Sequence, residues 1–214
     1  MKLTKDEIYD LLVPAACPPY GQALKYFKDR IENANSITEL GIGTGNIAKK
    51  ILENNPKANY IGIDFSSESL EKARKKLDGY DVSLIQADFS TVVLQRSDFI
   101  VSSLSIHHLE HYKQAELFEK IHNSCASFLH FELIAPKDNA ERVKNDLYVK
   151  NSANKVAKKL GLSEDDIDAM IKASNASDKP MALAEHERLH GSFGMQLEIL
   201  IHDHQFVMYQ TRRK

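Results

Sequence analysis

The sequence of 214 residues predicts an α/β fold built around a doubly wound, mostly parallel sheet. Short apolar runs alternate with amphipathic helical patterns from residue 36 to residue 135, which is typical of βαβ units. A glycine-rich turn at residues 41–45 follows the first apolar run, and helical patterns flank this core on both sides. We expect a single domain with four parts. These are a helical preface (1–34), a core (36–135), a helical insertion (138–190) and a terminal hairpin (195–210).

The composition is that of an ordinary globular domain, with 27% charged and 43% hydrophobic residues. A formal net charge of -2 gives no global field that favours a polyanion, so nucleic acid is disfavoured as a partner. The two cysteines, Cys17 and Cys125, are too few for a disulfide framework and predict reduced thiols. No signal peptide and no stretch long enough to span a membrane are recognised. We therefore expect a cytoplasmic protein, monomeric or homodimeric, that does not enter a membrane.

Capping and stop signals define the first elements. Thr4 and Glu7 form a capping box before an apolar helical pattern, and Pro18-Pro19 opens a second helix in the preface. The helix after the glycine-rich turn stops before Pro56, because the residue that precedes a proline avoids the helical region. The preface is therefore expected to contain two helices, and the core to begin with a βαβ unit.

The helix after the second strand carries acidic residues in its first turn and basic residues in its later turns, an order that complements the helix dipole. Ser66 or Ser67 caps this helix, and Gly79 stops it. The core strands are expected at residues 37–40, 59–65, 82–87, 99–104 and 128–135, and the other core helices at 46–54 and 112–126.

The pattern from Pro136 to about residue 190 is wholly helical, and this insertion is a candidate lid. Gly161 ends one helix, and Ser163, three residues before Asp166, caps the next. The last two strands are expected at residues 195–201 and 205–209, paired as an antiparallel hairpin, with His202 and His204 in an exposed turn between them.

The glycine-rich turn lies where a strand ends and a helix begins. Gly41 and Gly43 can adopt left-handed conformations and let a ligand approach the backbone, while Gly45 opens the helix. Asp64 ends the next strand, where its carboxylate can accept hydrogen bonds from both hydroxyls of a ribose. Taken alone, Asp64 fits a helix-capping role equally well. Together with the glycines, it indicates a ligand that contains a nucleoside.

Glu39 stands two residues before the first of these glycines. The third glycine comes one residue earlier than in the G-x-G-x-x-G fingerprint of dinucleotide-binding proteins. A carboxylate beside a helix N-terminus would repel a pyrophosphate and suits a cationic group, such as an ammonium or a sulfonium. S-adenosylmethionine carries both of these cations, and it is the cofactor that we expect.

Four motifs follow one another along the core: Glu39-Leu-Gly-Ile-Gly-Thr-Gly45, Ile61-Gly-Ile-Asp-Phe-Ser66, Ile85-Gln-Ala-Asp-Phe89 and Ser102-Ser-Leu-Ser-Ile-His-His-Leu109. They resemble the successive motifs of the class I, Rossmann-like S-adenosylmethionine-dependent methyltransferases. The resemblance implies a seven-stranded sheet of order 3-2-1-4-5-7-6 with an N-terminal helical lid. The segments before the fifth and sixth strands depart from the family pattern, which leaves the acceptor side open.

The resemblance also implies roles for single residues. The glycine-rich turn would hold the methionine part of the cofactor, Asp64 the ribose and Asp88 the adenine amino group. Phe65 and Phe89 would lie near the adenine, although each, taken alone, also fits a core aromatic. The implied cofactor-binding residues are Tyr20, Glu39, Gly41, Gly43, Thr44, Gly45, Asp64, Phe65, Asp88, Phe89, Ser103 and Leu104.

Two histidines follow the fourth strand directly and are the candidate catalytic residues. Methyl transfer from a sulfonium is an in-line displacement that depends mainly on alignment. Where the acceptor must lose a proton, His107 or His108 is the expected base, because the pKa of imidazole lies near neutrality. The alternative is that one ring points outward and the other packs structurally. We expect no metal site at the helical pairs His107/His111 or His186/His190, which lack a nearby cysteine or a suitably spaced carboxylate.

The sequence therefore predicts an enzyme, an S-adenosylmethionine-dependent methyltransferase that acts on a small-molecule acceptor. One alternative is the same fold using a modified sulfonium for another group transfer, such as carboxymethyl transfer. A second is a non-catalytic module that binds the cofactor for regulation. The glycine spacing argues against a third, a nicotinamide oxidoreductase.

Overall fold

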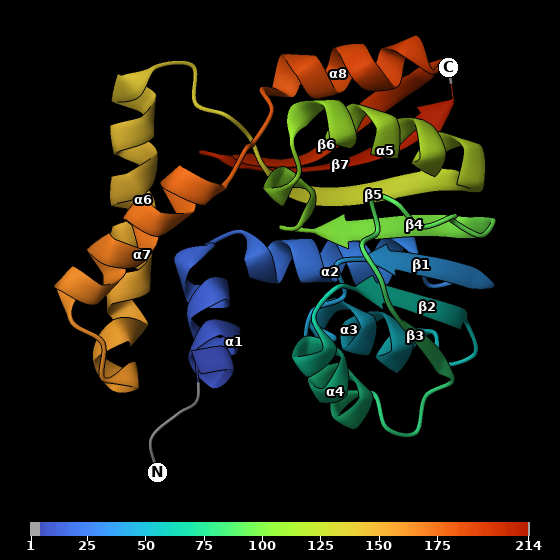
Figure 1. Cartoon of the computed structure of the whole chain (residues 1–214), viewed down its shortest axis with the longest axis horizontal. Coiled ribbons are helices and arrows are strands. Elements are labelled where there is room, and N and C mark those ends of the chain that lie inside the picture. Colours follow the sequence, from blue (N-terminus) through green and yellow to red (C-terminus); the bar gives the residue numbers. More distant parts are fainter. Residues whose placement is uncertain (1–4, 214) are drawn as a thin grey trace.

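The structure, a computed structural model, describes residues 5–213 of the chain and the side chains of residues 11–213. Its described part contains a seven-stranded sheet of order β3-β2-β1-β4-β5-β7-β6, which confirms the predicted topology (Figure 1). The strands β1 to β5 run parallel, and β7 is antiparallel to both β5 and β6. The strands are β1 (Ser36–Leu40), β2 (Asn59–Asp64), β3 (Val82–Gln86), β4 (Ser97–Ser103), β5 (Cys125–Leu133), β6 (Met195–Asp203) and β7 (Phe206–Arg213).

Helices cover both faces of this sheet, because alternate residues of each buried strand face opposite sides. Val101 packs in the cluster that contains α2, α3 and α4, whereas its neighbour Ile100 packs in the cluster that contains α5. Helix α8 lies against β6 and α5. The α-helices are α1 (Lys5–Ala16), α2 (Tyr20–Arg30), α3 (Asn46–Asn54), α4 (Ser67–Lys76), α5 (His111–Ser124), α6 (Asn139–Ala157), α7 (Glu164–Ser177) and α8 (Leu183–Ser192).

The predicted caps fix several helix starts. Ser66 caps α4, since its hydroxyl accepts a hydrogen bond from the Ser69 backbone N–H at 3.2 Å. Ser163 and Asp166 form the predicted capping box at the start of α7. The proposed cap at Thr4 lies outside the described residues, as does the side chain of Glu7. Short polar side chains therefore set the entry of α4 and α7 in the way that the sequence indicates.

A separate helical layer stands beside the carboxyl ends of the central strands. Helix α6 contacts both α1 and α7, and the three helices share a small apolar cluster around Leu12, Ala153 and Ile167. Figure 1 shows this layer at one end of the sheet, whereas α8 lies over the sheet itself. Within the predicted insertion, α6 and α7 therefore form the layer at this end and α8 belongs to the sheet packing.

Several element boundaries differ from the predicted ones, and two differences change the type of element. Helix α5 ends at Ser124, so Cys125 and Ala126 begin β5 instead of ending the helix, and β4 pairs with β5 from Cys125 onward. Residues 178–182 are not helical, although the pattern from 136 to 190 was expected to be wholly helical. Strand pairing decides the backbone at Cys125. In residues 178–182, Pro180 disfavours a helix at its own position and at Lys179.

The terminal hairpin forms as predicted, but its turn is shorter than expected because β6 continues to Asp203. His202 and Asp203 belong to β6, and His204 adopts a positive φ of 53° in the turn. The His204 ring stacks on Tyr148 of α6 with ring centroids 3.8 Å apart, and the Tyr148 hydroxyl donates to Asp203. His202 and His204 are both exposed, as expected, although the His204 ring contacts α6.

Cys17 and Cys125 are free thiols, as predicted. Burial raises the pKa of both, that of Cys125 to about 12, which keeps them protonated. Among the described helices, none is both long and apolar enough to cross a membrane.

Candidate functional site

A cavity of about 700 Å³ opens at the carboxyl ends of β1, β2 and β4. We call it the cofactor cavity. Eleven of the twelve predicted cofactor-binding residues line it; Gly45 does not. Open α/β sheets bind ligands at this edge, where the strand order reverses. The eleven are Tyr20, Glu39, Gly41, Gly43, Thr44, Asp64, Phe65, Asp88, Phe89, Ser103 and Leu104.

The glycine-rich turn uses left-handed backbone at three positions, with φ of 73° at Gly41, 53° at Gly43 and 82° at Gly45. A Cβ added to Gly41 would lie 2.6 Å from the Ser105 side chain. A Cβ added to Gly43 would meet no atom within 4 Å, so this glycine leaves space beside the backbone in the cavity. Gly45 instead packs against Ala73 and starts α3, so it stabilises the fold and does not line the cavity.

Asp64 connects the glycine-rich turn to the start of α4. One carboxylate oxygen accepts the Gly43 backbone N–H at 2.8 Å, and the other accepts the Ser66 backbone N–H at 2.9 Å. A carboxylate offers about four acceptor positions, so these bonds leave positions for ligand hydroxyls. The capping and ligand-binding interpretations of Asp64 are therefore compatible in one geometry.

Glu39 is a buried acid, 1% exposed, that lines the cofactor cavity. Burial raises its pKa to about 8; the hydrogen bond from the Tyr60 hydroxyl, 2.6 Å long, lowers the pKa, and nearby Asp64 raises it. A cation in the cavity would offset the cost of burying this carboxylate. The sequence analysis did not predict the contact between Tyr60 and Glu39. It depends on the β1–β2 register, which pairs Ile37 with Tyr60 and so places Tyr60 near Glu39 on the same face of the sheet.

The expected adenine side contains one exposed and one buried aromatic ring. Phe65 is 75% exposed although it lines the cavity, whereas Phe89 is 8% exposed and also belongs to the core cluster under α5. Asp88 accepts the Ser90 backbone N–H at 2.8 Å, and hydrogen bonding from Ser90 lowers its pKa. An exposed ring beside a carboxylate offers a stacking surface and a hydrogen-bond acceptor to a flat heterocycle.

The floor of the cofactor cavity is fixed by the end of β4. Leu104 adopts a positive φ of 48°, and its N–H donates to the Phe131 carbonyl at 2.8 Å. The Ser105 hydroxyl lies 2.8 Å from that of Ser102 and donates to the Leu40 carbonyl. Ser105 was not among the predicted residues; its position against Gly41, which only the folded turn shows, explains the need for glycine there.

A second cavity, of about 350 Å³, lies between α1, the α6–α7 layer and the sheet. We call it the acceptor cavity. It shares Val13, Leu104 and His108 with the cofactor cavity, so the two spaces adjoin. Most of its wall is apolar, and its polar end is formed by His107, His108 and Asp178.

The two candidate catalytic histidines differ in environment. His107 is 3% exposed, and its Nδ1 pairs with a carboxylate oxygen of Glu132, which is itself 1% exposed. Burial alone would lower the pKa of His107, but the Glu132 and Asp178 charges raise it overall. The His108 side chain is 56% exposed, and its Nδ1 lies 3.2 Å from Asp178. Glu132 and Asp178 were not predicted, because β5 and the segment after α7 meet these histidines only in the folded chain.

The other histidine pair considered for metal binding belongs to a core network. His186 Nδ1 and His190 Nε2 lie 3.0 and 2.9 Å from the Tyr209 hydroxyl, and His130 Nδ1 lies 2.8 Å from it. Burial lowers the pKa of His186 to about 3. In the part of the chain that the structure describes, the group with metal-ligand geometry is His107, His108 and Asp178, without His111.

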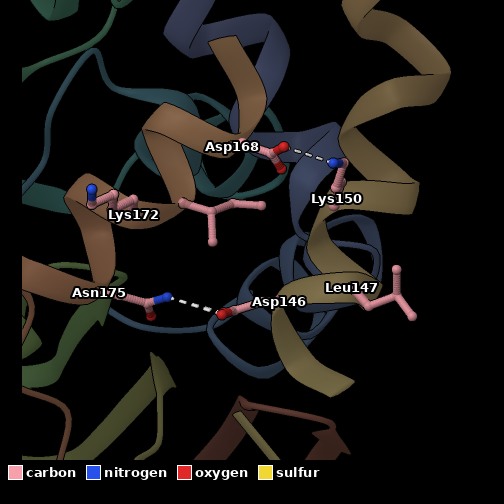
Figure 2. A pocket seen from close by; sticks show the side chains of 7 residues that line it. Asp146, Leu147, Lys150, Asp168, Lys172 and Asn175 are labelled. Carbon is pink, nitrogen blue, oxygen red and sulfur yellow. Dashed lines mark hydrogen bonds and ion pairs between the residues drawn. The ribbon is translucent and has the colours of Figure 1, made fainter. Parts of the chain in front are cut away.

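A third hollow lies on the helical layer, between α6 and α7 (Figure 2). Lys150 pairs with Asp168 at 2.8 Å, and the Asn175 amide donates to Asp146 at 3.1 Å, so polar contacts tie the two helices together. None of its lining residues lines the cofactor cavity, but Asp146, Ile171 and Asn175 also line the acceptor cavity, so the groove adjoins that cavity. We assign the contacts between the two helices to the packing of the layer.

Comparison with known proteins supports the assignment of the fold. The sequence model of the family described as "Methyltransferase domain" matches residues 37–127. A malonyl-[acyl-carrier protein] O-methyltransferase of Neorickettsia risticii is 43% identical over 72 residues, 34% of this chain and 28% of that protein. A carboxy-S-adenosyl-L-methionine synthase of Nautilia profundicola is 26% identical over 170 residues, 75% of this chain and 70% of that protein.

Solved structures show the same fold over the whole chain. Magnesium protoporphyrin IX methyltransferase from Synechocystis PCC 6803, with bound SAM, superposes with a TM-score of 0.63 at 10% identity, covering 100% of this chain and 86% of that one. The chain spans only 28% to 55% of the length of the first curated relatives that it matches. Residues 37–127 therefore match the methyltransferase-domain family, and the sheet order and the superposition show that the chain has the fold of the solved methyltransferase.

Proposed function

We propose that this protein transfers the methyl group of S-adenosylmethionine to a small molecule bound in the acceptor cavity. The observation that carries the proposal is the joining of two cavities at Val13, Leu104 and His108. One cavity has the features that a sulfonium nucleoside requires, and the other is enclosed by apolar helices. An in-line displacement needs such an arrangement, with the acceptor directly beside the methyl group.

The residues of the cofactor cavity fit the proposed cofactor. The buried Glu39 carboxylate is next to the glycine-rich turn and suits a positively charged methionine portion. Asp64 retains acceptor capacity for ribose hydroxyls, and the exposed Phe65 ring offers a face to the adenine. Bound in this way, S-adenosylmethionine supplies a methyl group on a positively charged sulfur.

The chain's own contribution to the reaction is alignment and control of one proton. The transfer forms a bond between the acceptor's nucleophilic atom and the methyl carbon and breaks the sulfur–methyl bond, whose electron pair stays on sulfur. An acceptor hydroxyl or ammonium also releases one proton. We assign this release to the polar end of the acceptor cavity, where His107, His108 and Asp178 meet. The apolar wall excludes water from the methyl group.

The charges around the acceptor cavity favour a neutral or cationic acceptor. Asp146 and Asp178 line it, and no lysine or arginine is among its described lining residues. A carboxylate or phosphate placed there would meet two acids and neither a lysine nor an arginine, which is unfavourable away from bulk water. We therefore propose a mainly apolar acceptor of about drug-fragment size, with a hydroxyl or amine as the methylated group.

The alternative is the use of a carboxylated sulfonium for another group transfer; one relative is named for making such a compound, not for using it. Neither cavity has a lysine or arginine among its described lining residues to pair with an added carboxylate. Methyl transfer is therefore the better-supported chemistry. Mass analysis of the products separates the two, since methylation adds one methyl group and carboxymethylation adds a larger fragment.

The proposed function is tested by incubating the protein with methyl-labelled S-adenosylmethionine and fractionated metabolite extract. We expect label in a small, neutral or basic product. Label in protein or RNA fractions alone would contradict the small-molecule assignment. With the identified acceptor, His108→Ala should lower turnover by at least about tenfold. A change of less than a few-fold would remove the histidine pair from the chemistry.

A further inference from the structure

Three side chains converge at the polar end of the acceptor cavity. His107 Nε2 lies 3.8 Å from one carboxylate oxygen of Asp178, and His108 Nδ1 lies 3.2 Å from the other. One ligand atom from each of the three side chains can be chosen so that all lie within 4.8 Å of one another. We propose that His107, His108 and Asp178 bind one divalent transition-metal ion, with two imidazole nitrogens and one carboxylate oxygen as ligands.

The distances suit an ion of this class. Nitrogen and oxygen ligands bound about 2.1 Å from a tetrahedral ion lie roughly 3.4 Å apart. The separations of 3.8 and 3.2 Å run to different oxygens of Asp178, and one ligand atom from each side chain can be chosen within 4.8 Å of the other two, so a small inward shift of the side chains brings all three to that spacing. Because His108 is 56% exposed at its side chain, its ring can adjust to the ion without disturbing the core. Three protein ligands leave a coordination position open toward the acceptor cavity, as in catalytic metal sites.

Glu132 is a hydrogen-bond partner for the ring nitrogen of His107 that does not face the proposed metal, as is usual for metal-binding histidines. The Nδ1 of His107 pairs with Glu132, which leaves Nε2 as the nitrogen that faces Asp178. Glu132 is held in turn by the backbone N–H groups of Ile106 at 2.9 Å and Leu133 at 2.8 Å. A carboxylate, histidine and metal in series fix the ring orientation and the tautomer of the ligand. This pairing is an observation independent of the three converging atoms.

Asp178 is fixed against the histidine turn by the segment that ends the helical layer. The Lys179 backbone N–H donates to the His107 carbonyl at 2.7 Å. The Gln114 amide bridges the carbonyls of Leu109 and Lys179 at 2.8 and 2.7 Å. Residues 178–182 thus leave the predicted helical pattern where they dock on the turn that carries His107 and His108. The docking positions a carboxylate from a distant part of the chain beside the two imidazoles.

The ligand set decides the class of ion and its role. Imidazole favours zinc, iron, cobalt or nickel, whereas magnesium and calcium prefer all-oxygen sites. The role, though not the binding, rests on the proposed function. An ion at this point faces the acceptor cavity, where it lowers the pKa of a bound hydroxyl. The two histidines then act as ligands, and the hydroxyl proton leaves to water.

The proposal is tested by titrating the chelator-treated full chain with zinc, cobalt and magnesium in a calorimeter. We expect one zinc ion per chain, an absorption band on cobalt binding and no magnesium binding at the same concentrations. His108→Ala and Asp178→Asn should each weaken zinc binding by at least about tenfold. Glu132→Gln should weaken it by roughly 10 to 100-fold. His111→Ala is the matched control, since it removes a nearby exposed histidine outside the cluster, and should leave zinc affinity unchanged.

Two further measurements distinguish a loss of zinc binding from a loss of folding or of cofactor binding. Thermal unfolding in chelator checks that each variant folds, and S-adenosylhomocysteine binding checks that its cofactor cavity is intact. Zinc binding below 100 µM that is lost in His108→Ala and Asp178→Asn, with S-adenosylhomocysteine affinity retained, supports the proposal. Absence of zinc binding at 100 µM in the wild-type chain, or equal affinity in both variants, would overturn it. In either case, retained S-adenosylhomocysteine binding leaves the proposed methyl transfer standing.

Discussion

The Asp64 carboxylate accepts the Gly43 backbone N–H at 2.8 Å, and this bond joins the end of β2 to the glycine-rich turn. The same carboxylate also accepts the Ser66 N–H before α4. One side chain therefore shapes the cofactor cavity and caps a helix, with acceptor capacity left for a ligand. The contribution of Asp64 to ligand binding and its contribution to stability at the start of α4 can be measured separately.

Asp64→Ala should weaken S-adenosylhomocysteine binding by at least about tenfold, because a charge-assisted hydrogen bond contributes roughly 1.5–3 kcal/mol. The loss of the hydrogen bond from the backbone N–H of Ser66, the N-cap residue of α4, should lower the free energy of unfolding by about 1 kcal/mol. Calorimetric titration and urea unfolding measure the two effects. Ser66→Ala is the control, since it removes the α4 side-chain cap and leaves the carboxylate in place. Equal cofactor affinity in Asp64→Ala and the wild-type chain would contradict the ligand role.

Cofactor affinity should rise with pH up to about 8. Burial raises the pKa of Glu39 to about 8, so its carboxyl is neutral below that pH and can balance a cation only after losing its proton. Affinity for S-adenosylhomocysteine should therefore increase by up to about tenfold per pH unit below 8 and then level off. Glu39→Gln should bind weakly, with little pH dependence. A flat profile in the wild-type chain would count against a charged Glu39 in the complex.

The same titration has the opposite effect on the free protein. The folded chain holds a proton on Glu39 between the ordinary pKa of 4.5 and about 8, whereas the unfolded chain has released it. This carboxyl therefore contributes stability at low pH that is lost as the pH rises toward 8. Comparing urea unfolding of the wild-type chain and Glu39→Gln at pH 6 and pH 8 isolates the contribution. A wild-type chain that gains stability over this interval relative to Glu39→Gln would reverse the expected sign.

Gly41→Ala should destabilise the protein by about 1–3 kcal/mol. The added Cβ would lie 2.6 Å from Ser105, and φ at this position is 73°. Gly21→Ala is the matched control: Gly21 lies inside α2 with nothing within 4 Å, so alanine should stabilise the helix by roughly 0.5–1 kcal/mol. Thermal unfolding of the two variants should show shifts of opposite sign. A Gly41→Ala variant as stable as the wild-type chain would mean that the turn has another accessible conformation.

Tyr209→Phe should cost about 1–3 kcal/mol of folding stability. The Tyr209 hydroxyl is fully buried and contacts the imidazoles of His130, His186 and His190, which would lose a hydrogen-bond partner. Tyr112→Phe is the control, because Tyr112 is 62% exposed and its hydroxyl can be replaced by water. Urea unfolding measures both variants. Similar stabilities for the two would show that the histidines find other partners.

The sheet could be predicted from the sequence because local sequence patterns indicate each strand and helix. Apolar runs alternate with capped helices, and the cap at Ser66 and the capping box at Ser163 form as expected. Most of the predicted cofactor-binding residues could be named because they lie within the four motifs that resemble those of the methyltransferases, whereas Tyr20 comes from the helical preface. Short-range patterns are sufficient for such features.

The residues that sequence reasoning missed act across long distances in the chain. Tyr60 reaches Glu39 through strand pairing, and Asp178 reaches His108 through the docking of the segment after α7. Cys125 begins a strand because it pairs with Ser97, although the local pattern continues the preceding helix. Partners of this kind depend on register and docking, which no local pattern encodes.

The most direct test of the central claim is a calorimetric titration of the full chain with S-adenosylhomocysteine and, separately, with a nicotinamide dinucleotide. The cofactor cavity, with Glu39 beside the glycine-rich turn and Asp64 at the end of β2, predicts one S-adenosylhomocysteine site per chain and no dinucleotide binding. Tight dinucleotide binding without S-adenosylhomocysteine binding would contradict the account.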